Sequence, residues 1–424
     1  FNRDLDKWNT LNVERMDEMF MQTRNFNGNI DGWKTENVIQ TAGMFDQARA
    51  FNRNINSWDV GEVRNMNRMF RSTWIFDQPL DNWNTEKVTQ MVNIFDGALL
   101  FNRNLNDWNT SKVITMKEAF RDTPKFNNGE IGLVSNTLSW DMSKVRNTQS
   151  MFQNAAAFNS YLSGWDLGEV SEMASMFRSS SWNNGASAGV STTLSWDVEK
   201  ARQMSNMFLD NSAFNANISA WNPIALEVMM STFKNASAFN NGFPAGSAGT
   251  ATISNTLDWN TPNLIFLTES FASATAFNSY INNWNVSAVT NISSMTHNAT
   301  SFNQPLDNWN VGNVQYMENV FRGATSFNQP IGNWDVTSVQ KFNSMFDGAS
   351  IFDQDISCWC VPNNPERNNF SNASPVDAKP NYIPRWDLPC SPILTMTDSL
   401  SLAGDDTLIG PGESITFTAS FDRD

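Results

Sequence analysis

The residues whose spacing fits nucleophilic catalysis lie at 185–189, where GASAG matches the G-x-S-x-G pattern of hydrolases. That pattern works only when a strand precedes the serine, a helix follows it and a histidine completes a triad. Here the segment lies in a Gly, Ser and Ala-rich stretch, and the single histidine, His297, lies far along the chain. The sequence therefore favours a turn at Ser187 and a locally substituted position at His297.

A row of aspartates offers a second kind of chemistry, because two or three acids in a groove are enough to cleave a glycosidic bond. The same repeat position holds Asn elsewhere in the chain, which a tuned acid and base pair would not tolerate. We therefore expect a structural or solvated row, and we predict that the chain is not an enzyme. The aspartates of the row are Asp59, Asp141, Asp166, Asp197 and Asp335.

Motifs for cofactors and metals are missing from the sequence. It contains no phosphate-binding G-x-x-x-x-G-K-[ST], no H-E-x-x-H and no EF-hand loop. We expect no cofactor and no metal.

The net charge of −15 makes nucleic acid an unfavourable partner, because such binding depends on Lys and Arg that neutralise phosphates. No run of about 20 apolar residues is present, so we expect no membrane span in this segment. The chain opens at Phe1 inside a repeat. We therefore expect that any signal peptide and further domains lie outside it, and that it is part of a longer protein.

A repeat of 25 residues organises the chain, as in 302–326, FNQPLDNWNVGNVQYMENVFRGATS. A fixed period of this length is typical of a solenoid. A Trp follows seven residues after the leading Phe in every unit without an insertion, and a second Phe follows twelve residues after that Trp in most units. The fourteen units begin at Phe1, Phe26, Phe51, Phe76, Phe101, Phe126, Phe158, Trp182, Phe214, Phe239, Phe277, Phe302, Phe327 and Phe352.

Each unit predicts a short strand followed by a short helix. Leu306, Trp309 and Val311 have the L-x-x-W-x-V spacing of a leucine-rich-repeat strand, with Trp and Val pointing inward. The spacing from Val314 through Met317 to Phe321 places one apolar face on a helical turn. We therefore predict an α/β solenoid of leucine-rich-repeat-like parallel coils, in which stacking buries Phe on Phe and Trp on Trp.

The second position of every unit is Asn or Asp. We interpret this column as an internal ladder, in which side chains bond the backbone of neighbouring turns. A ligand-binding role for the column is the alternative.

These residues closely resemble the repeat shared by mycoplasma surface lipoproteins and the BspA-like leucine-rich surface proteins of Bacteroidetes, F-N-x-x-[LI]-x-x-W-[DN]-[VT]-x-x-V-x-x-M-x-x-M-F. The resemblance covers residues 1–376, and the segment from Trp359-Cys360-Val361 to Pro389-Cys390 resembles the end of flavobacterial members. It implies an exported, extracellular protein of the bacterial cell surface, often called an adhesin, and supplies no catalytic residues.

We expect three parts: a solenoid of fourteen coils at 1–376, a cap at 377–390, and the beginning of an immunoglobulin-like β-sandwich at 391–424, where apolar and polar residues alternate. A disulfide between Cys360 and Cys390 is predicted to fasten the cap to the last coil, with Cys358 as the alternative partner. A metal site at Cys358 and Cys360 is disfavoured, because no His or fourth Cys lies nearby.

Three units carry insertions, which begin with N-N-G and return through T-L-[SD]-W. The shared sequences predict loops on one edge, and insertions in solenoids often form the binding face. Apolar content suggests a contact ridge for a protein or glycan there, whereas drift in loop length is the alternative. The candidate ridge residues are Glu130, Ile131, Leu133, Val134 and Phe243.

The strand face is a second candidate binding surface, carrying Asn84, Asn109, Asn285 and Asn310. We rank it lower because it lacks exposed aromatic rings. The sequence as a whole predicts an adhesion or partner-binding module that acts on a protein or glycan at a cell or matrix surface. The alternative is a structural spacer or filament segment without a specific ligand.

Overall fold

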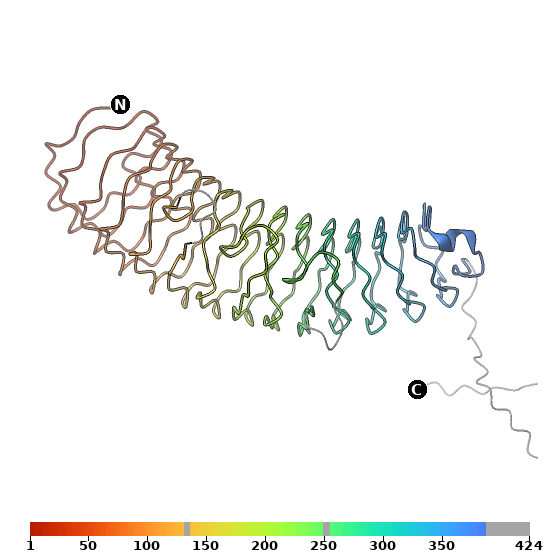
Figure 1. The fold of residues 1–424 in the computed structure, drawn as a ribbon. Helices are drawn as coiled ribbons and strands as arrows, with labels where there is room; N and C mark the ends of the chain where they lie inside the picture. Colours follow the sequence, from red (N-terminus) through yellow and green to blue (C-terminus); the bar gives the residue numbers. More distant parts are fainter. Residues whose placement is uncertain (131–135, 249–254, 387–424) are drawn as a thin grey trace, which may run out of the picture. The chain divides into compact units, whose positions relative to one another are not determined.

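The computed structural model describes residues 1–130, 136–248 and 255–386, and the chain divides into two units, Phe1–Cys390 and Ser391–Asp424. In the first unit the backbone forms coils that lie side by side in a stack (Figure 1). We number the coils 1–14 after the sequence repeats, and positions 1–25 from the leading aromatic residue, leaving inserted residues out. The predicted sandwich segment and residues 387–390 of the predicted cap lie outside the described residues.

The prediction of an α/β solenoid with one strand and one helix per coil is wrong. The only helix within the described residues is η1, a four-residue 3-10 helix at Pro375–Ala378. No described residue belongs to an extended strand. Isolated parallel β-bridges join the coils instead, as between Arg15 and Gln40 and between Gln40 and Asn65. They lie mostly at position 15, inside the predicted helix and away from the predicted strand.

Two left-handed residues in every coil explain why no helix forms. Positions 18 and 22 have positive φ along the whole stack, beginning with Glu18 at 54° and Gln22 at 61°. A right-handed helix needs negative φ at each residue, and the left-handed region costs an L-residue about 1–2 kcal/mol. Gly, Asn, Asp and Ser fill most of these positions, and no β-branched or aromatic residue does. The apolar spacing fits a helix, but the backbone does not follow one.

Along positions 16–22 every second backbone N–H donates to the next coil. The N–H groups between these bonds donate within their own coil, as Met21 does to the Glu18 carbonyl at 3.0 Å. Both sets of amides are therefore satisfied, one between coils and one within them. The bonds from coil 1 to coil 2 are Met16 to Gln40 (2.9 Å), Glu18 to Ala42 (2.9 Å), Phe20 to Met44 (2.8 Å) and Gln22 to Asp46 (2.7 Å).

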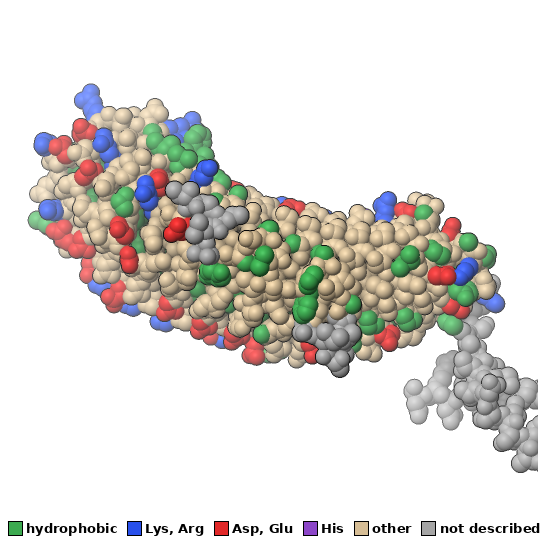
Figure 2. Space-filling view, in the orientation of Figure 1, with side chains coloured by type: hydrophobic (Ala, Val, Ile, Leu, Met, Phe, Trp, Pro, Cys, Tyr) green, Lys and Arg blue, Asp and Glu red, His purple; other side chains and the backbone are tan. Residues whose placement is uncertain are grey.

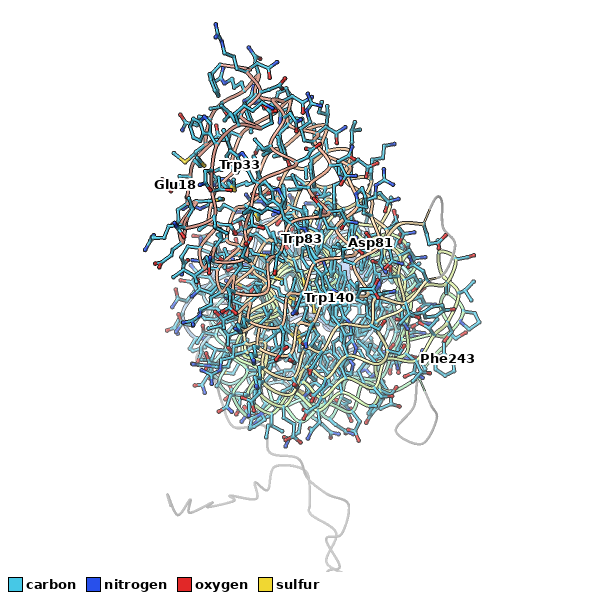
Figure 3. The ribbon with its side chains drawn as sticks, turned by 90° about the vertical axis from the view of Figure 1, so that its left-hand side faces the viewer. Glu18, Trp33, Asp81, Trp83, Trp140 and Phe243 are labelled. Carbon is cyan, nitrogen blue, oxygen red and sulfur yellow. The ribbon has the colours of Figure 1, made fainter. Side chains whose placement is uncertain are left out.

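Aromatic rings stack in columns through the core. The rings of Trp33 and Trp58 are 6.1 Å apart between centroids and inclined by 3°, and those of Phe45 and Phe51 are 3.9 Å apart. Viewed along the stack, Trp83 and Trp140 lie in the interior, whereas Glu18 and Phe243 lie at opposite edges (Figure 3). The predicted stacking of Phe on Phe and Trp on Trp is confirmed, as is the inward direction of the tryptophans.

The indole nitrogen explains why the eighth position is Trp and not another apolar residue. The Nε1–H of Trp83 donates to the Ile55 carbonyl of the preceding coil at 3.1 Å, and Trp108 does the same to Leu80 at 3.0 Å. The bond recurs in every coil from 2 to 14. Each tryptophan thus fills the core and also satisfies a buried carbonyl.

The predicted ladder of position-two side chains is confirmed. The Asn52 Oδ1 accepts the backbone N–H of Asp77 at 3.0 Å, and the Asp77 Oδ1 accepts that of Asn102 at 3.0 Å. The same bond joins each pair of neighbouring coils. Only an oxygen is required, which explains why Asp replaces Asn in two coils.

Replacing Trp83 with Phe should lower the free energy of unfolding by about 2–4 kcal/mol, because a buried hydrogen bond is lost and a cavity is left. Trp74 is exposed and donates no indole bond within the described residues, so Trp74→Phe is the control and should change stability by less than about 1 kcal/mol. Urea denaturation followed by circular dichroism measures both. Equal effects of the two substitutions would contradict the role given to the indole bond.

Ser294 has φ of 57° and donates its backbone N–H to Glu318 at 2.7 Å. Ser294→Gly should raise the free energy of unfolding by up to about 1 kcal/mol, since glycine adopts this conformation without steric strain. Ser294→Val should lower it by more than that, because a β-branched residue is strained at positive φ. Urea midpoints test the pair, and a valine variant as stable as glycine would show that the position is not left-handed in solution.

Candidate functional site

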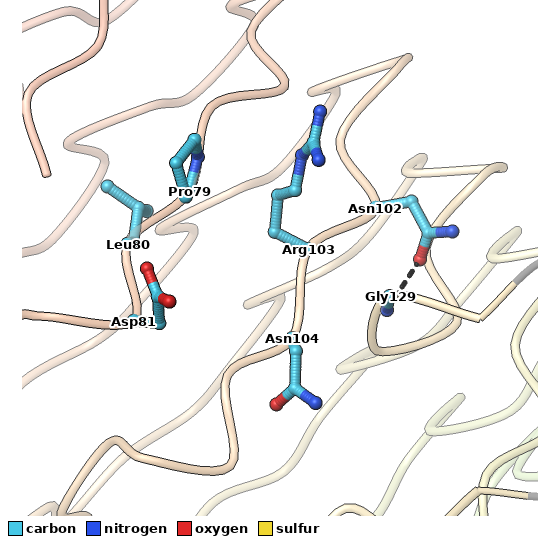
Figure 4. A pocket seen from close by; sticks show the side chains of 7 residues that line it. All are labelled: Pro79, Leu80, Asp81, Asn102, Arg103, Asn104 and Gly129. Carbon is cyan, nitrogen blue, oxygen red and sulfur yellow. Dashed lines mark hydrogen bonds between the residues drawn. The ribbon is translucent and has the colours of Figure 1, made fainter.

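A pocket of about 270 Å³ with a mixed polar and apolar lining opens on the edge of coils 4–6 (Figure 4). Asp81 and Arg103 bring opposite charges to it, and two asparagine amides add donors and acceptors. Such convergence of a few polar groups in a concavity is typical of a ligand site. Its lining residues are Pro79, Leu80, Asp81, Asn102, Arg103, Asn104 and Gly129.

Hydrogen bonds hold the charged and amide groups of the pocket in place. The Asp81 carboxylate accepts a bond from the Asn56 Nδ2 at 2.7 Å, and the Arg103 guanidinium pairs with Asp77 at 2.7 Å. The Asn102 Oδ1 accepts the Gly129 N–H at 3.0 Å. The pocket is therefore preorganised by bonds that link neighbouring coils.

Gly129 is the one pocket residue whose lack of a side chain is required. Its φ is 87°, and a Cβ there would lie 3.0 Å from the backbone nitrogen of Asn104. The N-N-G sequence places two left-handed residues in succession, Asn128 and Gly129, at the start of the first insertion. The pocket therefore forms where the first insertion begins.

The three inserted loops return to the stack at the same position. Parallel bridges join Thr137 to Tyr161, Thr193 to Asn217 and Thr256 to Tyr280, each at position 4 of the following coil. These bridges place the loops on one edge, in agreement with the predicted placement.

Ladder asparagines also tie the loops to the coils beside them. The Asn102 Nδ2 donates to the Glu130 carbonyl of the first loop at 2.8 Å, and the Asn159 Nδ2 donates to the Ala186 carbonyl of the second at 2.8 Å. A single amide, Asn215 Nδ2, bridges the second loop at Gly189 (3.2 Å) and the third at Phe243 (3.0 Å). The loops are thus held as one edge by their backbone.

Of the predicted ridge residues, Glu130 is exposed and Phe243 is half-buried on this edge. Ile131, Leu133 and Val134 lie outside the described residues. The ridge stays a prediction, and Glu130 directly follows the pocket residue Gly129.

The predicted asparagine row has a turn-forming geometry. In each of its members the side-chain oxygen accepts the backbone N–H two residues later, which closes an Asx turn. The amides are exposed, but their oxygens are already engaged. The backbone N–H donors and their acceptors are Glu86 to Asn84 (3.1 Å), Ser111 to Asn109 (3.1 Å), Ser287 to Asn285 (3.0 Å) and Gly312 to Asn310 (3.2 Å).

The aspartate row occupies the same position and makes the same turn. At Asp141 the Ser143 hydroxyl and backbone N–H both donate to the carboxylate and lower its pKa. A general acid needs a raised pKa, so this environment works against proton donation. Ser187 of the hydrolase-like segment is exposed at a turn, where the Asn183 Nδ2 donates to its backbone carbonyl at 2.7 Å.

Buried acids elsewhere are paired with arginines of the neighbouring coil. Arg71 donates two bonds to Asp46 at 2.8 and 2.7 Å, and Arg121 donates two to Asp96 at 3.0 and 2.7 Å. Burial raises the pKa of Asp96 despite that partner. These pairs occupy one column, position 21, and link coils rather than form a site.

The structure tests one half of the predicted disulfide between Cys360 and Cys390. Cys360 is disulfide-bonded, whereas Cys358 is a free, exposed thiol. Cys390, the predicted partner, lies outside the described residues, so the pairing stays a prediction.

An exposed apolar surface on coils 3 and 4 was missed by the sequence reasoning. We name Trp74, Ile75, Leu99 and Leu100 the apolar shelf; their exposed fractions are 42%, 41%, 39% and 48%. The Leu100 N–H donates to the Trp74 carbonyl at 3.2 Å, so the two coils are in direct contact here. Figure 2 shows hydrophobic side chains gathered near the N-terminal end of the stack, beside Lys and Arg. The sequence does distinguish these four residues, because positions 24 and 25 hold Ser, Thr or Ala in most later coils, whereas coils 3 and 4 hold large apolar residues there.

A second exposed apolar group lies on coils 9 and 10. Met230, Ile265 and Phe266 are exposed there, and the Met229 N–H donates to the Phe266 carbonyl at 2.9 Å. This group lies at positions 14–17, away from the loops and from the shelf positions.

Stacked coils, satisfied by backbone ladders and decorated by loops on one edge, define a solenoid repeat protein. The chain belongs to the family described as "Mycoplasma protein of unknown function, DUF285", whose model matches residues 1–91, 71–190, 190–247 and 245–359 in tandem. No curated protein matches the chain.

Within residues 1–130, 136–248 and 255–386, no three His, Cys, Asp or Glu side chains are grouped to hold a metal ion. No helix of that part is suited in length and apolarity to cross a membrane.

The single histidine gives a clean test of the electrostatics. Burial and the nearby Arg322 lower the pKa of His297 below 6.5, so the folded protein binds this proton more weakly than the unfolded chain does. Stability should therefore fall as the pH drops through about 6.5 toward the folded-state pKa, and His297→Gln should remove that part of the dependence. Urea midpoints at two pH values measure the loss, and NMR titration of the imidazole gives the pKa directly. A folded-state pKa above 6.5 would contradict the assigned environment.

Proposed function

We propose that this chain is a partner-binding module of a bacterial cell-surface protein, which uses the rigid stack to present the loop-bearing edge to a protein or glycan. The single observation that carries the proposal is the preorganised pocket of coils 4–6, where the regular surface is interrupted beside a loop. A spacer has no need of a concave site with an acid, a guanidinium and amides held by hydrogen bonds.

The resemblance to BspA-like surface proteins supports an extracellular, adhesin-type role, and membership of a mycoplasma family is compatible with it. The predicted disulfide would suit an oxidising environment outside the cell. The localisation and the adhesive role are therefore part of this proposal.

A structural spacer is the second candidate, and the unbroken ladders favour it. Side-chain and backbone bonds join coil to coil along the described stack, which resists bending and extension. A spacer would require no pocket, no loops and no exposed apolar groups, all of which are present.

The pocket can be tested against matched residues of the same columns. Arg53 lies at the position of Arg103 and donates its Nε–H to the Asn27 carbonyl at 2.7 Å, as Arg103 does to Asp77 at 2.9 Å. Asp307 accepts a bond from the Asn282 Nδ2 at 2.7 Å, as Asp81 does from Asn56. Neither control residue lines the pocket.

A glycan and protein array probed with the whole chain should reveal a ligand whose affinity falls at least about tenfold in Arg103→Ala or Asp81→Asn, because charged hydrogen bonds are lost. Arg53→Ala and Asp307→Asn should leave it within about twofold. A silent array, or equal losses in all four variants, would count against the pocket and in favour of the spacer.

A further inference from the structure

The residues of the apolar shelf are large and apolar at repeat positions that hold small or polar residues in most other coils. Positions 24 and 25 are Thr300 and Ser301 in coil 11 and Thr325 and Ser326 in coil 12, which are suited to exposure. In coils 3 and 4 all four residues at these positions are large and apolar, and they are about 40–50% exposed. Such a departure is not needed for stacking, because other coils stack without it.

Cations surround the shelf, although the protein as a whole is acidic. Positions 24–25 and 1–4 around coils 1–5 carry six cations and two acids, whereas the equivalent positions of coils 7–13 carry no charged residue. This edge is therefore positive within a chain of net charge −15. The cations are Arg3, Arg24, Arg49, Arg53, Arg103 and Lys125, and the acids are Asp4 and Asp77.

The shelf and the cations form one continuous stripe. Position 24 reads Arg24, Arg49, Trp74, Leu99 and Pro124 along coils 1–5, so apolar side chains are flanked by cations on neighbouring coils. At a spacing of about 4.8 Å per coil, the stripe spans roughly 20 Å. The Arg49 guanidinium lies 4.0 Å from the centre of the Trp74 ring, which joins the charged and apolar parts.

We propose that the apolar shelf and its flanking cations bind the surface of a lipid bilayer that contains anionic phospholipid. Tryptophan and aliphatic side chains enter the boundary between headgroups and acyl chains, while Arg and Lys contact the phosphates. None of the four shelf residues lines the pocket, although Arg103 belongs both to the pocket and to the flanking cations.

The composition and shape of the stripe favour an anionic bilayer over an acidic glycan or an acidic protein as the partner. An acidic glycan would bind the cations and stack on the exposed Trp74 ring, whereas the aliphatic side chains of Ile75, Leu99 and Leu100 would add little to its recognition. A protein partner needs a complementary interface of about 1,000 Å² or more. A bilayer needs only projecting apolar side chains within reach of cations, which is the arrangement present here. The acidic remainder of the molecule would also orient this edge toward an anionic surface.

The experiment is sedimentation of the whole chain with vesicles of phosphatidylcholine alone or mixed equally with phosphatidylglycerol. The test variant is Trp74→Thr, Ile75→Ser, Leu99→Thr and Leu100→Ser together, which installs residues that coils 11 and 12 already use. The partition coefficient on anionic vesicles should fall at least about tenfold, because the apolar area that enters the boundary is removed. Neutral vesicles should bind the unchanged protein weakly.

Ile351→Ser is the matched control, since Ile351 occupies position 25 of coil 13, is 47% exposed and has no cations at the equivalent positions of its own coil. It should leave vesicle binding within about twofold. A second variant, Arg24→Ser with Lys125→Ser, leaves the shelf intact and should lower partitioning about fivefold for each cation, with a matching loss at high salt. It keeps the test decisive if the four-residue variant unfolds.

Equal binding to neutral and anionic vesicles, or full binding by both variants, would overturn the inference. Binding to a sulfated glycan with none to vesicles would assign the cations to a polysaccharide instead. The vesicle variants change no pocket residue, and Asp81 lines the pocket without belonging to the stripe, so neither result decides the pocket test. Failure of the array alone leaves bilayer binding standing.

Discussion

The constraint on which this structure depends is that every coil must offer the same row of backbone donors and acceptors to its neighbours. The backbone at positions 16–22, with left-handed residues at 18 and 22, provides that row, since one set of its amides donates to the next coil and the other set within its own coil. The side chains are arranged to suit this register. Asn or Asp at position 2 and Trp at position 8 each add one bond between coils, and both bonds are satisfied only when the coils are in register.

Much of the core could be predicted from the sequence, because burial depends on the type and period of the side chains. Trp309 and Phe321 lie in the core as expected, and the oxygen common to Asn and Asp identified the position-two ladder. The backbone could not be predicted in the same way. Val314, Met317 and Phe321 have a spacing that fits a helix, and they are buried in a ribbon that is not one. The information that distinguishes the two lies in the small polar residues between them, which tolerate a positive φ.

The candidate site was predictable to a smaller extent. Insertions are visible in a repeat alignment, so the loop edge was expected, whereas the pocket depends on which side chains of three coils lie together and on the close approach of Gly129 to Asn104. Trp74 and Leu99 differ in residue type from the same position of other coils, but their coils keep the regular length of 25 residues. An inspection of insertions therefore does not detect them. Their signal was a departure from Ser and Thr at a position with no place in the core. In a repeat protein, such departures are as informative as insertions.

The direction of the backbone ladder has a consequence for how the chain can change in length. At positions 16–22 each coil presents N–H groups to the next coil and carbonyls to the preceding one, so an additional coil placed in the array would meet complementary partners on both sides. Gene duplication or deletion of one repeat therefore alters the reach of the protein in discrete steps and leaves the remaining coils with their bonds intact. Recombination can therefore change the number of regular coils. The few irregular coils keep their own structure while their distance from the ends of the array changes.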